Sequence, residues 1–253
     1  MGGTMAATGG QSAGKPCERP ETLLCDDFES SASGAEPGAP LWTPQPAWQN
    51  DRIRVTDAQA HSGSRSASVT GAPYGTALVP VKEFPTDGKP LYVRVYLRTE
   101  KSTADMAGHV SFIEGAEKLG DDGEELRLGA SHGQLDVNLI PGSKGTGGTG
   151  EKTQFSNGRV DIPGDGGPGV VLKPGVWTCI EAMFDGKNHR FSAWVDGKKV
   201  DGLEVTDWQQ GRKNWSPSYR YLKIGGQNFS GATGKLYYDD IVVSTAGPIG
   251  CDG

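Results

Sequence analysis

The chain has 253 residues, a net charge of −6 at pH 7 and a sequence pI of about 5.3. Because no run of Lys and Arg residues stands out, the charge argues against a nucleic-acid partner. No apolar run approaches the roughly 18 residues that a membrane span needs. The 39 glycines and 16 prolines, without any long stretch of helical periodicity, predict short strands joined by many turns.

The N-terminal segment, residues 1–22, is predicted to be a flexible linker. It starts with MGGTMAATGGQSAGKPC, which lacks the charged region and the apolar core of an intact signal peptide. The chain contains four cysteines, and an even number fits an oxidising compartment. Cys17 and Cys25 are near enough in sequence to close a small loop, which leaves Cys179 to pair with Cys251. We therefore expect a secreted protein, which its linker could tether to a cell surface.

Strand patterns follow in one block, which predicts a single domain over residues 23–253. The alternation of apolar and polar residues is clear in 91–100 and in ELRLGASHGQLDVN, residues 125–138, where a turn separates two strands. The other predicted strand segments are residues 22–30, 52–59, 65–71, 77–84, 108–115, 176–200 (a hairpin), 219–227 and 235–245. A Gly-rich loop over 141–169 is expected to be functional or mobile. About a dozen strands without an intervening helix predict an all-β, two-sheet sandwich or jelly roll with one curved, groove-forming sheet.

The polar side of these strands is the candidate functional surface. In the strand at 108–115, simple alternation places Glu114 with Val110 and Phe112, on the face opposite His109. The candidates for the polar surface as a whole are Arg94, Tyr96, Arg98, His109, Ser111, Glu125, Arg127, His132, Asp136, Asn138, Tyr221, Lys223 and Gln227. A wet antiparallel sheet carries such residues in any case, so the residue types alone also fit a face that only meets solvent.

Two catalytic patterns are absent from the sequence. The glucanases of this architecture carry two carboxylates on one strand face in an E-x-D-x-x-E pattern, and the acids in FIEG and EELRL lack that spacing. There is no G-x-S-x-G turn that would present a nucleophilic serine. Hydrolysis is therefore a weak interpretation of this sequence.

Several motifs, taken in chain order, resemble a known group of proteins. FES near the start, HSGSRS, WTCIE, FSAWVDGKKVDGL, YYDDIVV and the final IGC are similar to the concanavalin-A-like jelly rolls of polysaccharide-active enzymes. The nearest resemblance is to the fungal cellulose-induced jelly-roll proteins and the glucuronan lyases, and it covers roughly residues 22–251. It implies a polysaccharide lyase that cleaves a uronic-acid polymer, with a carbohydrate-binding protein or a glycoside hydrolase of the same fold as alternatives.

The resemblance also implies roles for the polar residues. β-Elimination needs a group that neutralises the uronate carboxylate, a base for the C5 proton and an acid for the leaving oxygen. His109 is expected to be the base and Arg127 the neutralising group, with Tyr221, Lys223 and Gln227 as further catalytic candidates. Further candidates are expected to bind an acidic polysaccharide: Arg94, Tyr96, Arg98, Glu125, His132 and Asn138. The protein is expected to act as a monomer.

A structural Ca²⁺ ion is implied as well, tying the N-terminal strand to the C-terminal one. Ca²⁺ takes about six to eight oxygen ligands, which carboxylates, hydroxyls and carbonyls can supply. The resemblance places the ion at Glu29, Ser62, Ser64 and Asp240. Because Asp239 and Asp240 are adjacent in a strand, only one of the two is expected to face the ion.

Overall fold

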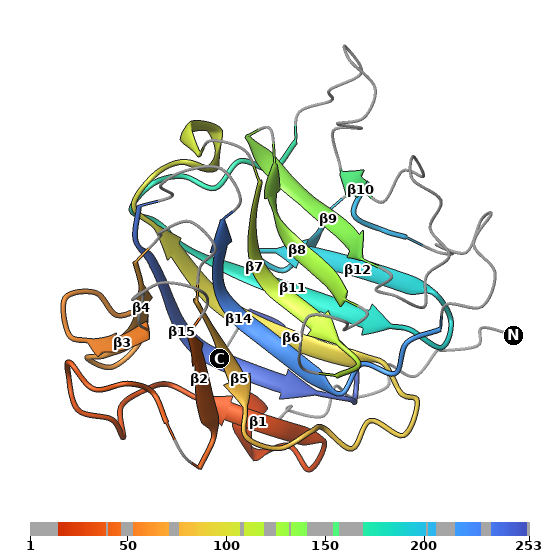
Figure 1. Ribbon diagram of the computed structural model, residues 1–253, viewed down its shortest axis with the longest axis horizontal. Coiled ribbons are helices and arrows are strands. Elements are labelled where there is room, and N and C mark those ends of the chain that lie inside the picture. Colours follow the sequence, from red (N-terminus) through yellow and green to blue (C-terminus); the bar gives the residue numbers. More distant parts are fainter. Residues whose placement is uncertain are drawn as a thin grey trace, which may run out of the picture.

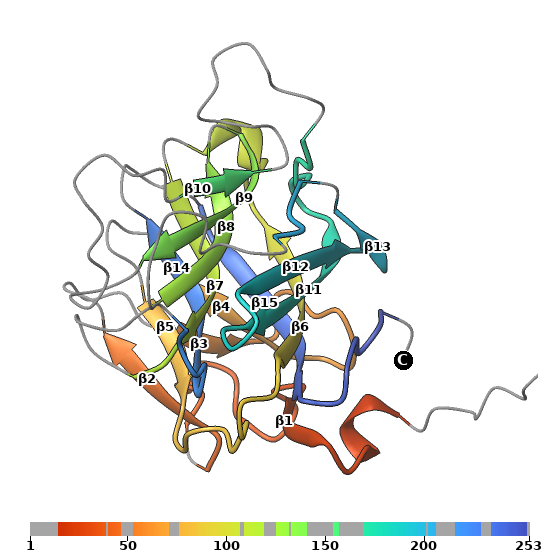
Figure 2. The same ribbon diagram turned by 90° about the vertical axis from the view of Figure 1, so that its right-hand side faces the viewer.

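The computed structural model describes residues 15–38, 40–46, 53–70, 76–106, 109–118, 125–131, 133–140, 154–156, 169–200, 202–205, 216–228 and 234–251. Among these residues, helical structure is confined to two 3-10 turns, η1 (Pro16–Glu18) and η2 (Thr103–Asp105), and the rest of the regular structure is strand. No helix in this part of the chain is long and apolar enough to cross a membrane. Two antiparallel sheets pack face to face (Figures 1 and 2), so the predicted all-β, two-sheet fold is confirmed.

One layer is an eight-stranded sheet in the order β13-β12-β11-β6-β15-β4-β3, and β1 pairs with the second half of β15. Its strands are β1 (Thr22–Asp26), β3 (Ile53–Thr56), β4 (Ser66–Val69), β6 (Leu91–Thr99), β11 (Trp177–Asp185), β12 (Arg190–Val195), β13 (Lys198–Lys199) and β15 (Leu236–Ser244). β4 pairs with the first half of β15, and the register of β15 with β6 shifts between Asp239 and Val242. The first and last strands of the domain therefore lie side by side.

The other layer is a seven-stranded sheet in the order β10-β9-β8-β7-β14-β5-β2. Its strands are β2 (Trp42–Pro46), β5 (Thr76–Pro80), β7 (His109–Ala116), β8 (Glu125–Ser131), β9 (Gln134–Ile140), β10 (Gln154–Ser156) and β14 (Tyr221–Asn228). Figure 2 shows this sheet on the left and the eight-stranded sheet on the right. The predicted strand pair in 125–138 is the β8–β9 hairpin.

Apolar side chains from the two inner faces form one core, as the alternation predicts. Val93, Val95 and Leu97 of β6 are at most 1% exposed, and Leu126 and Leu128 of β8 are equally buried. Because successive side chains of a strand point to opposite faces, the polar neighbours of these residues lie on the outer faces of the two sheets.

Strand β7 departs from simple alternation, and this corrects the predicted placement of Glu114. The register of β7 with β8 shifts between Ser111 and Ile113, which marks a β-bulge. Phe112 and Ile113 both join the core, so Glu114 lies on the outer face together with His109. The alternation misplaced Glu114 because a bulge adds one residue and reverses the faces of all residues after it.

Two residues of the segment that was predicted to be a flexible linker, Arg19 and Glu21, are hydrogen-bonded to the C-terminal part of the domain. The Arg19 guanidinium donates a hydrogen bond to the Ile249 carbonyl at 3.5 Å, and the Thr245 N–H donates to the Glu21 carbonyl at 3.4 Å. Residues 1–14 of the predicted linker lie outside the described residues.

Both predicted disulfides are present. Cys17 pairs with Cys25, and Cys179 of β11 pairs with Cys251 near the C-terminus, over a separation of 72 residues. Loop-closure entropy predicts that a Cys179→Ser/Cys251→Ser variant loses about 4 kcal/mol of unfolding free energy, measured by urea denaturation. A Cys17→Ser/Cys25→Ser variant is the matched control, and its separation of only 8 residues predicts a smaller loss of about 2.5 kcal/mol. Equal losses in the two variants would contradict this explanation.

Candidate active site

The outer face of the seven-stranded sheet gathers the predicted catalytic residues. Strands β9, β8, β7 and β14 are consecutive in this sheet, and Figure 1 shows them side by side; we call their outer surface the polar face. The structure brings together on it His109 from β7, Glu125 and Arg127 from β8, and Tyr221, Lys223 and Gln227 from β14. All five predicted catalytic residues and one predicted substrate-binding residue therefore share one surface.

Two acidic and two basic side chains form a charged cluster on the polar face, consisting of Glu114, Glu125, Arg127 and Lys223. Arg127 Nε and Nη2 donate to Glu125 Oε2 at 2.9 and 2.6 Å, and Arg127 Nε lies 3.6 Å from Glu114 Oε1. Lys223 Nζ donates to Glu125 Oε1 and lies 3.6 Å from Glu114 Oε2. These side chains are only 5% to 16% exposed, so water screens their charges poorly.

Burial decides how the charged cluster titrates. Removal from water raises the pKa of Glu114, and the nearby Glu125 adds to this rise, whereas Arg127 and Lys223 oppose it. Glu114 therefore takes up a proton at a higher pH than an ordinary glutamate does. With Glu114 protonated, the cluster carries two positive charges against one negative charge, which favours an anionic group of a ligand.

A second row of residues crosses the same four strands next to the charged cluster. The strand register pairs Asp136 with Gly129, Gly129 with Ser111, and Ser111 with Gln227; we call these four residues the Gly129 row. Gly129 leaves the centre of the row without a side chain. A Cβ atom there would lie 1.9 Å from the carbonyl oxygen of Val110, so no larger residue fits without a shift of the main chain.

His109 is on β7, two residues before Ser111, and its side chain approaches Asp136 at the β9 end of the Gly129 row. The distance from His109 Nε2 to Asp136 Oδ1 is 3.9 Å, which is too long for a hydrogen bond but short enough for electrostatic attraction. Burial raises the pKa of Asp136 to about 7, and the Ser131 hydroxyl opposes this rise. A carboxyl group that titrates near neutral pH beside an imidazole is typical of sites that exchange protons.

Glu114 was not among the predicted residues of the polar surface, and Asp136 was placed on that surface without a catalytic or binding role. The β7 bulge concealed the orientation of Glu114. Asp136 alternates with Leu135 and Val137, so its face is visible in the sequence, but its burial depends on neighbours that are distant in the chain. His132 lies outside the described residues, and the backbone of Asn138 pairs with Arg127 on β8.

The structure does not bring Arg94, Tyr96 and Arg98 to the polar face, which corrects the predicted substrate-binding set. They belong to β6 in the other sheet, whose outer surface faces the opposite way. The Arg94 guanidinium donates to the Gly250 carbonyl at 3.2 Å, and the Tyr96 hydroxyl donates to the Cys251 carbonyl. Arg94 and Tyr96 therefore fasten the C-terminal segment to the sheet. The alternation within β6 was predicted correctly, but it does not say which sheet the strand joins.

Part of the predicted calcium-binding set meets at the turn between β3 and β4. Glu29, which follows β1, accepts hydrogen bonds from the N–H groups of Ser64 at 2.7 Å and Arg65 at 2.6 Å, and from the Ser64 hydroxyl at 2.8 Å. These bonds, led by the one from the Ser64 N–H, lower the pKa of Glu29. Glu29 is therefore an ionised carboxylate that holds this turn against the end of β1.

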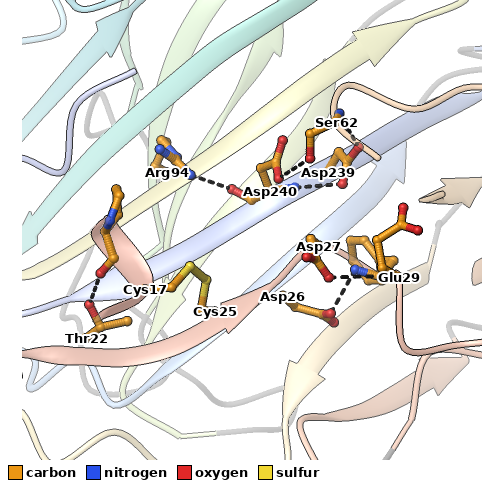
Figure 3. The surroundings of a disulfide bond; sticks show 12 residues. Cys17, Thr22, Cys25, Asp26, Asp27, Glu29, Ser62, Arg94, Asp239 and Asp240 are labelled. Atoms are coloured by element: carbon orange, nitrogen blue, oxygen red, sulfur yellow. Dashed lines mark hydrogen bonds between the residues drawn. A yellow bond between two sulfur atoms is a disulfide. The ribbon is translucent and has the colours of Figure 1, made fainter. Parts of the chain in front are cut away.

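Asp239 and Asp240 of β15 both face the other side of this turn, which corrects the expectation that only one would. Asp239 Oδ2 accepts the His61 N–H at 2.7 Å, and Ser62 Oγ donates to Asp240 Oδ1 at 2.8 Å. Asp240 has a φ of +47° at the register shift of β15, and Figure 3 shows the Asp239 and Asp240 side chains near Ser62. Among the described residues, no group of three or more His, Cys, Asp and Glu side chains could hold a metal ion.

Comparisons with known proteins bear on the resemblance seen in the sequence. A family model described as "Polysacc_lyase-like: Cip1-like, core domain" matches residues 162–246. Among curated proteins, none matches this sequence. The solved structure of "Cellulose induced protein, Cip1" superposes with a TM-score of 0.68 at 21% sequence identity, covering 90% of this chain and 100% of that chain.

Two further solved structures share the fold. An endo-β-1,4-glucuronan lyase from the fungus Trichoderma reesei superposes with a TM-score of 0.53 at 12% identity, covering 85% of this chain and 95% of that chain. The binding domain of botulinum neurotoxin DC, solved in complex with rat synaptotagmin II, has a TM-score of 0.52 at 5% identity and covers 89% of this chain and 48% of that chain. The chain is therefore a concanavalin-A-like jelly roll whose residues 162–246 are similar to the Cip1-like core domain of the polysaccharide-lyase-like group.

Proposed function

We propose that the protein is a secreted polysaccharide lyase that cleaves a uronic-acid-containing polysaccharide by β-elimination on the polar face. The charged cluster, on the same sheet face as His109, is the observation that supports this most, because one surface then carries both cations and an imidazole. Tyr221, at the start of β14, adds a phenol to this surface at the end of β7 that is farther from His109. A neutralising cation, a base and an acid are the three groups that β-elimination needs. Two disulfides fit an extracellular, oxidising environment.

Arg127 and Lys223 would attract the carboxylate of the substrate. Both contact Glu114 and Glu125, so a further carboxylate binds best once the charged cluster has taken up a proton. Glu114 is the acid that accepts it, because burial raises its pKa. Neutralising the substrate carboxylate makes the proton on C5 more acidic.

His109 in its neutral form would remove the C5 proton, and the resulting imidazolium would protonate the leaving oxygen, because Tyr221 pairs with Ala116 at the far end of β7 from His109. The C5–H electron pair forms the C4–C5 double bond as the bond from C4 to the glycosidic oxygen breaks. An ionised Asp136, whose Oδ1 lies 3.9 Å from His109 Nε2, stabilises the imidazolium that results. The products are a chain with an unsaturated uronate at its new end and a chain with a free hydroxyl.

The experiment is an absorbance assay with a set of polyuronates. The double bond conjugated to the carboxylate absorbs ultraviolet light, so absorbance should rise with the wild-type protein and rise about 100-fold or more slowly with His109→Ala. His189→Ala is the matched control, since this imidazole lies in the β11–β12 turn and contacts Ser216 at 2.6 Å; it is expected to keep the wild-type rate. A flat trace on every polyuronate would refute the proposal.

A non-catalytic carbohydrate-binding protein is the second candidate. It is favoured by the pairing of Arg127 and Lys223 with Glu125, because neither cation is reserved for a substrate. Retention of the protein on a polysaccharide gel, without new absorbance and without new reducing ends, would support binding alone. New reducing ends without absorbance would support a hydrolase.

We also propose a structural Ca²⁺ ion at the turn between β3 and β4. Glu29 on one side of the turn and Asp240 on the other would both have to turn toward the ion, and Ser62 and Ser64 would supply further oxygens, which are the ligands that Ca²⁺ prefers. Ca²⁺ at about 100 times its dissociation constant should raise the unfolding free energy by about 2.7 kcal/mol, and a chelator should reverse this. Glu29→Gln should remove the effect, and Glu18→Gln, in η1, should keep it. An unfolding temperature of the wild-type protein that does not respond to Ca²⁺ would contradict this proposal.

A further inference from the structure

We propose that the Gly129 row is a subsite for the hydroxyl groups of a pyranose ring, which Asp136, Ser111 and Gln227 bind directly. This inference rests on the proposed function only in placing a carbohydrate on the polar face. It assigns the hydroxyl groups of the sugar to the Gly129 row and its carboxylate to the charged cluster. The inference holds whether or not the sugar is cleaved.

The Gly129 row contains an unusual number of buried polar atoms without good hydrogen bonds. Within the described residues, Asp136 Oδ1, Asp136 Oδ2, Ser111 Oγ and Gln227 Oε1 are buried and make no hydrogen bond of good geometry, although the Ser131 hydroxyl approaches Asp136 and the Ser111 hydroxyl approaches Glu114 closely enough to lower the pKa of each acid. Asp136 is 0% and Ser111 is 2% exposed. Leaving such groups unpaired costs stability, and native proteins retain few of them. Four such atoms in one row of one sheet face indicate that a polar ligand completes their hydrogen bonds.

The shape of the row suits a ring laid across the strands. Three strand spacings separate the backbone of Asp136 from that of Gln227, about 14 Å in total. Gly129 stands between Asp136 and Ser111 and places no side chain there. The space that a Gly129 side chain would take is filled by the main chain of β7, whose Val110 carbonyl oxygen lies 1.9 Å from the Cβ position, so only main chain separates Asp136 from Ser111 in the row.

The four atoms are hydrogen-bond acceptors, so they favour hydroxyl groups of a ligand over a carboxylate. The two oxygens of an ionised Asp136 and the Gln227 carbonyl oxygen only accept hydrogen bonds, and the Ser111 hydroxyl can accept one as well. Sugar hydroxyls supply the matching donors, whereas a uronate carboxylate would meet the negative charge of Asp136. The charged cluster lies one row away, about 7 Å along the strands. The carboxylate is therefore directed to Arg127 and Lys223, and the ring hydroxyls to the Gly129 row.

The test uses two variants and a matched control, in an otherwise full-length His109→Ala protein so that the probe stays uncut. Asp136→Asn and Gln227→Met each remove one acceptor. The control is Glu181→Gln on the opposite sheet, a buried acid that accepts hydrogen bonds from the Ile249 N–H at 2.6 Å and the Gly250 N–H at 3.1 Å. Calorimetry measures binding of a tetrasaccharide of glucuronic acid, and cellotetraose is the uncharged probe. Thermal unfolding without a ligand measures stability at about pH 8.

A ligand subsite predicts that binding and stability change in opposite directions. Asp136→Asn and Gln227→Met should weaken binding of the tighter probe about tenfold, and Asp136→Asn should raise the unfolding temperature by several degrees. Glu181→Gln should lower the unfolding temperature and leave binding unchanged. A lower unfolding temperature for Asp136→Asn, unchanged binding in both row variants, or no binding of either probe would overturn the subsite.

The proposed lyase activity and the proposed subsite can be refuted separately. Binding that depends on the Gly129 row, in a wild-type protein that generates no ultraviolet absorbance, refutes the lyase and supports the subsite. Cleavage by Asp136→Asn and Gln227→Met with an unchanged Michaelis constant supports the lyase and overturns the subsite.

Discussion

Asp136→Asn is expected to stabilise the protein by about 4 kcal/mol at about pH 8 and by almost nothing at about pH 4. The pKa of Asp136 is raised from 3.8 to about 7 by burial, so the folded state binds the proton more tightly than the unfolded state does. Stability is therefore greatest below the unfolded pKa and is lost as the pH rises through the folded pKa. Asparagine carries no charge at any of these pH values, so the variant lacks this loss.

Urea denaturation of the wild-type protein and of Asp136→Asn, at intervals between about pH 4 and pH 8, measures this difference. Burial also raises the pKa of Asp239 to about 7 and raises the pKa values of Asp26, Glu114 and Glu181, so the wild-type curve alone contains several contributions. The difference between the two proteins isolates Asp136. A difference that is the same at every pH would show that the Asp136 carboxyl group is not desolvated in the folded protein.

Arg127→Ala is expected to lower the unfolding free energy by about 3 kcal/mol, because it leaves Glu114 and Glu125 buried with one cation between them. Replacing the Arg127–Glu125 pair together, as Arg127→Met/Glu125→Leu, should cost much less. That double variant keeps the Lys223–Glu114 pair, whose atoms lie 3.6 Å apart, and so leaves no unbalanced charge.

The matched control for this prediction is Arg54→Ala. Arg54 pairs with Glu36 at 2.6 Å, but the two side chains are 31% and 47% exposed, so the loss should stay below about 1 kcal/mol. Additive losses in the Arg127 and Glu125 single and double variants would contradict a coupled cluster. The prediction also matters for the activity assay, because an inactive Arg127→Ala protein must first be shown to be folded.

The features that could be predicted from sequence are those set by neighbours in the chain. Alternation of apolar and polar residues located β6, β8 and β9, and the Asp-Gly-Lys turns located the β11–β12 hairpin. Spacing along the chain was enough to pair Cys17 with Cys25. All of these depend on side-chain direction or chain length over a few residues, which the sequence displays directly.

The features that could not be predicted depend on partners far away in the chain. Alternation shows that β6 has two different faces, but only its pairing with β11 and β15 reveals that Arg94 lies on the other sheet. A single extra residue in β7 moved Glu114 to the polar face. A second register shift, in β15, accompanies the unexpected approach of both Asp239 and Asp240 to one turn. The burial that raises the pKa of Asp136 likewise has no local signal.

The most direct test of the central proposal is the mass of the oligosaccharides released from a polyuronate by the wild-type protein. If the polar face carries out β-elimination, each unsaturated product will be lighter than the corresponding hydrolysis product by one water molecule, and His109→Ala will release almost none. Saturated products, or a polymer that is bound and left intact, would contradict a lyase and leave the polar face as the site of a hydrolase or of a carbohydrate-binding protein.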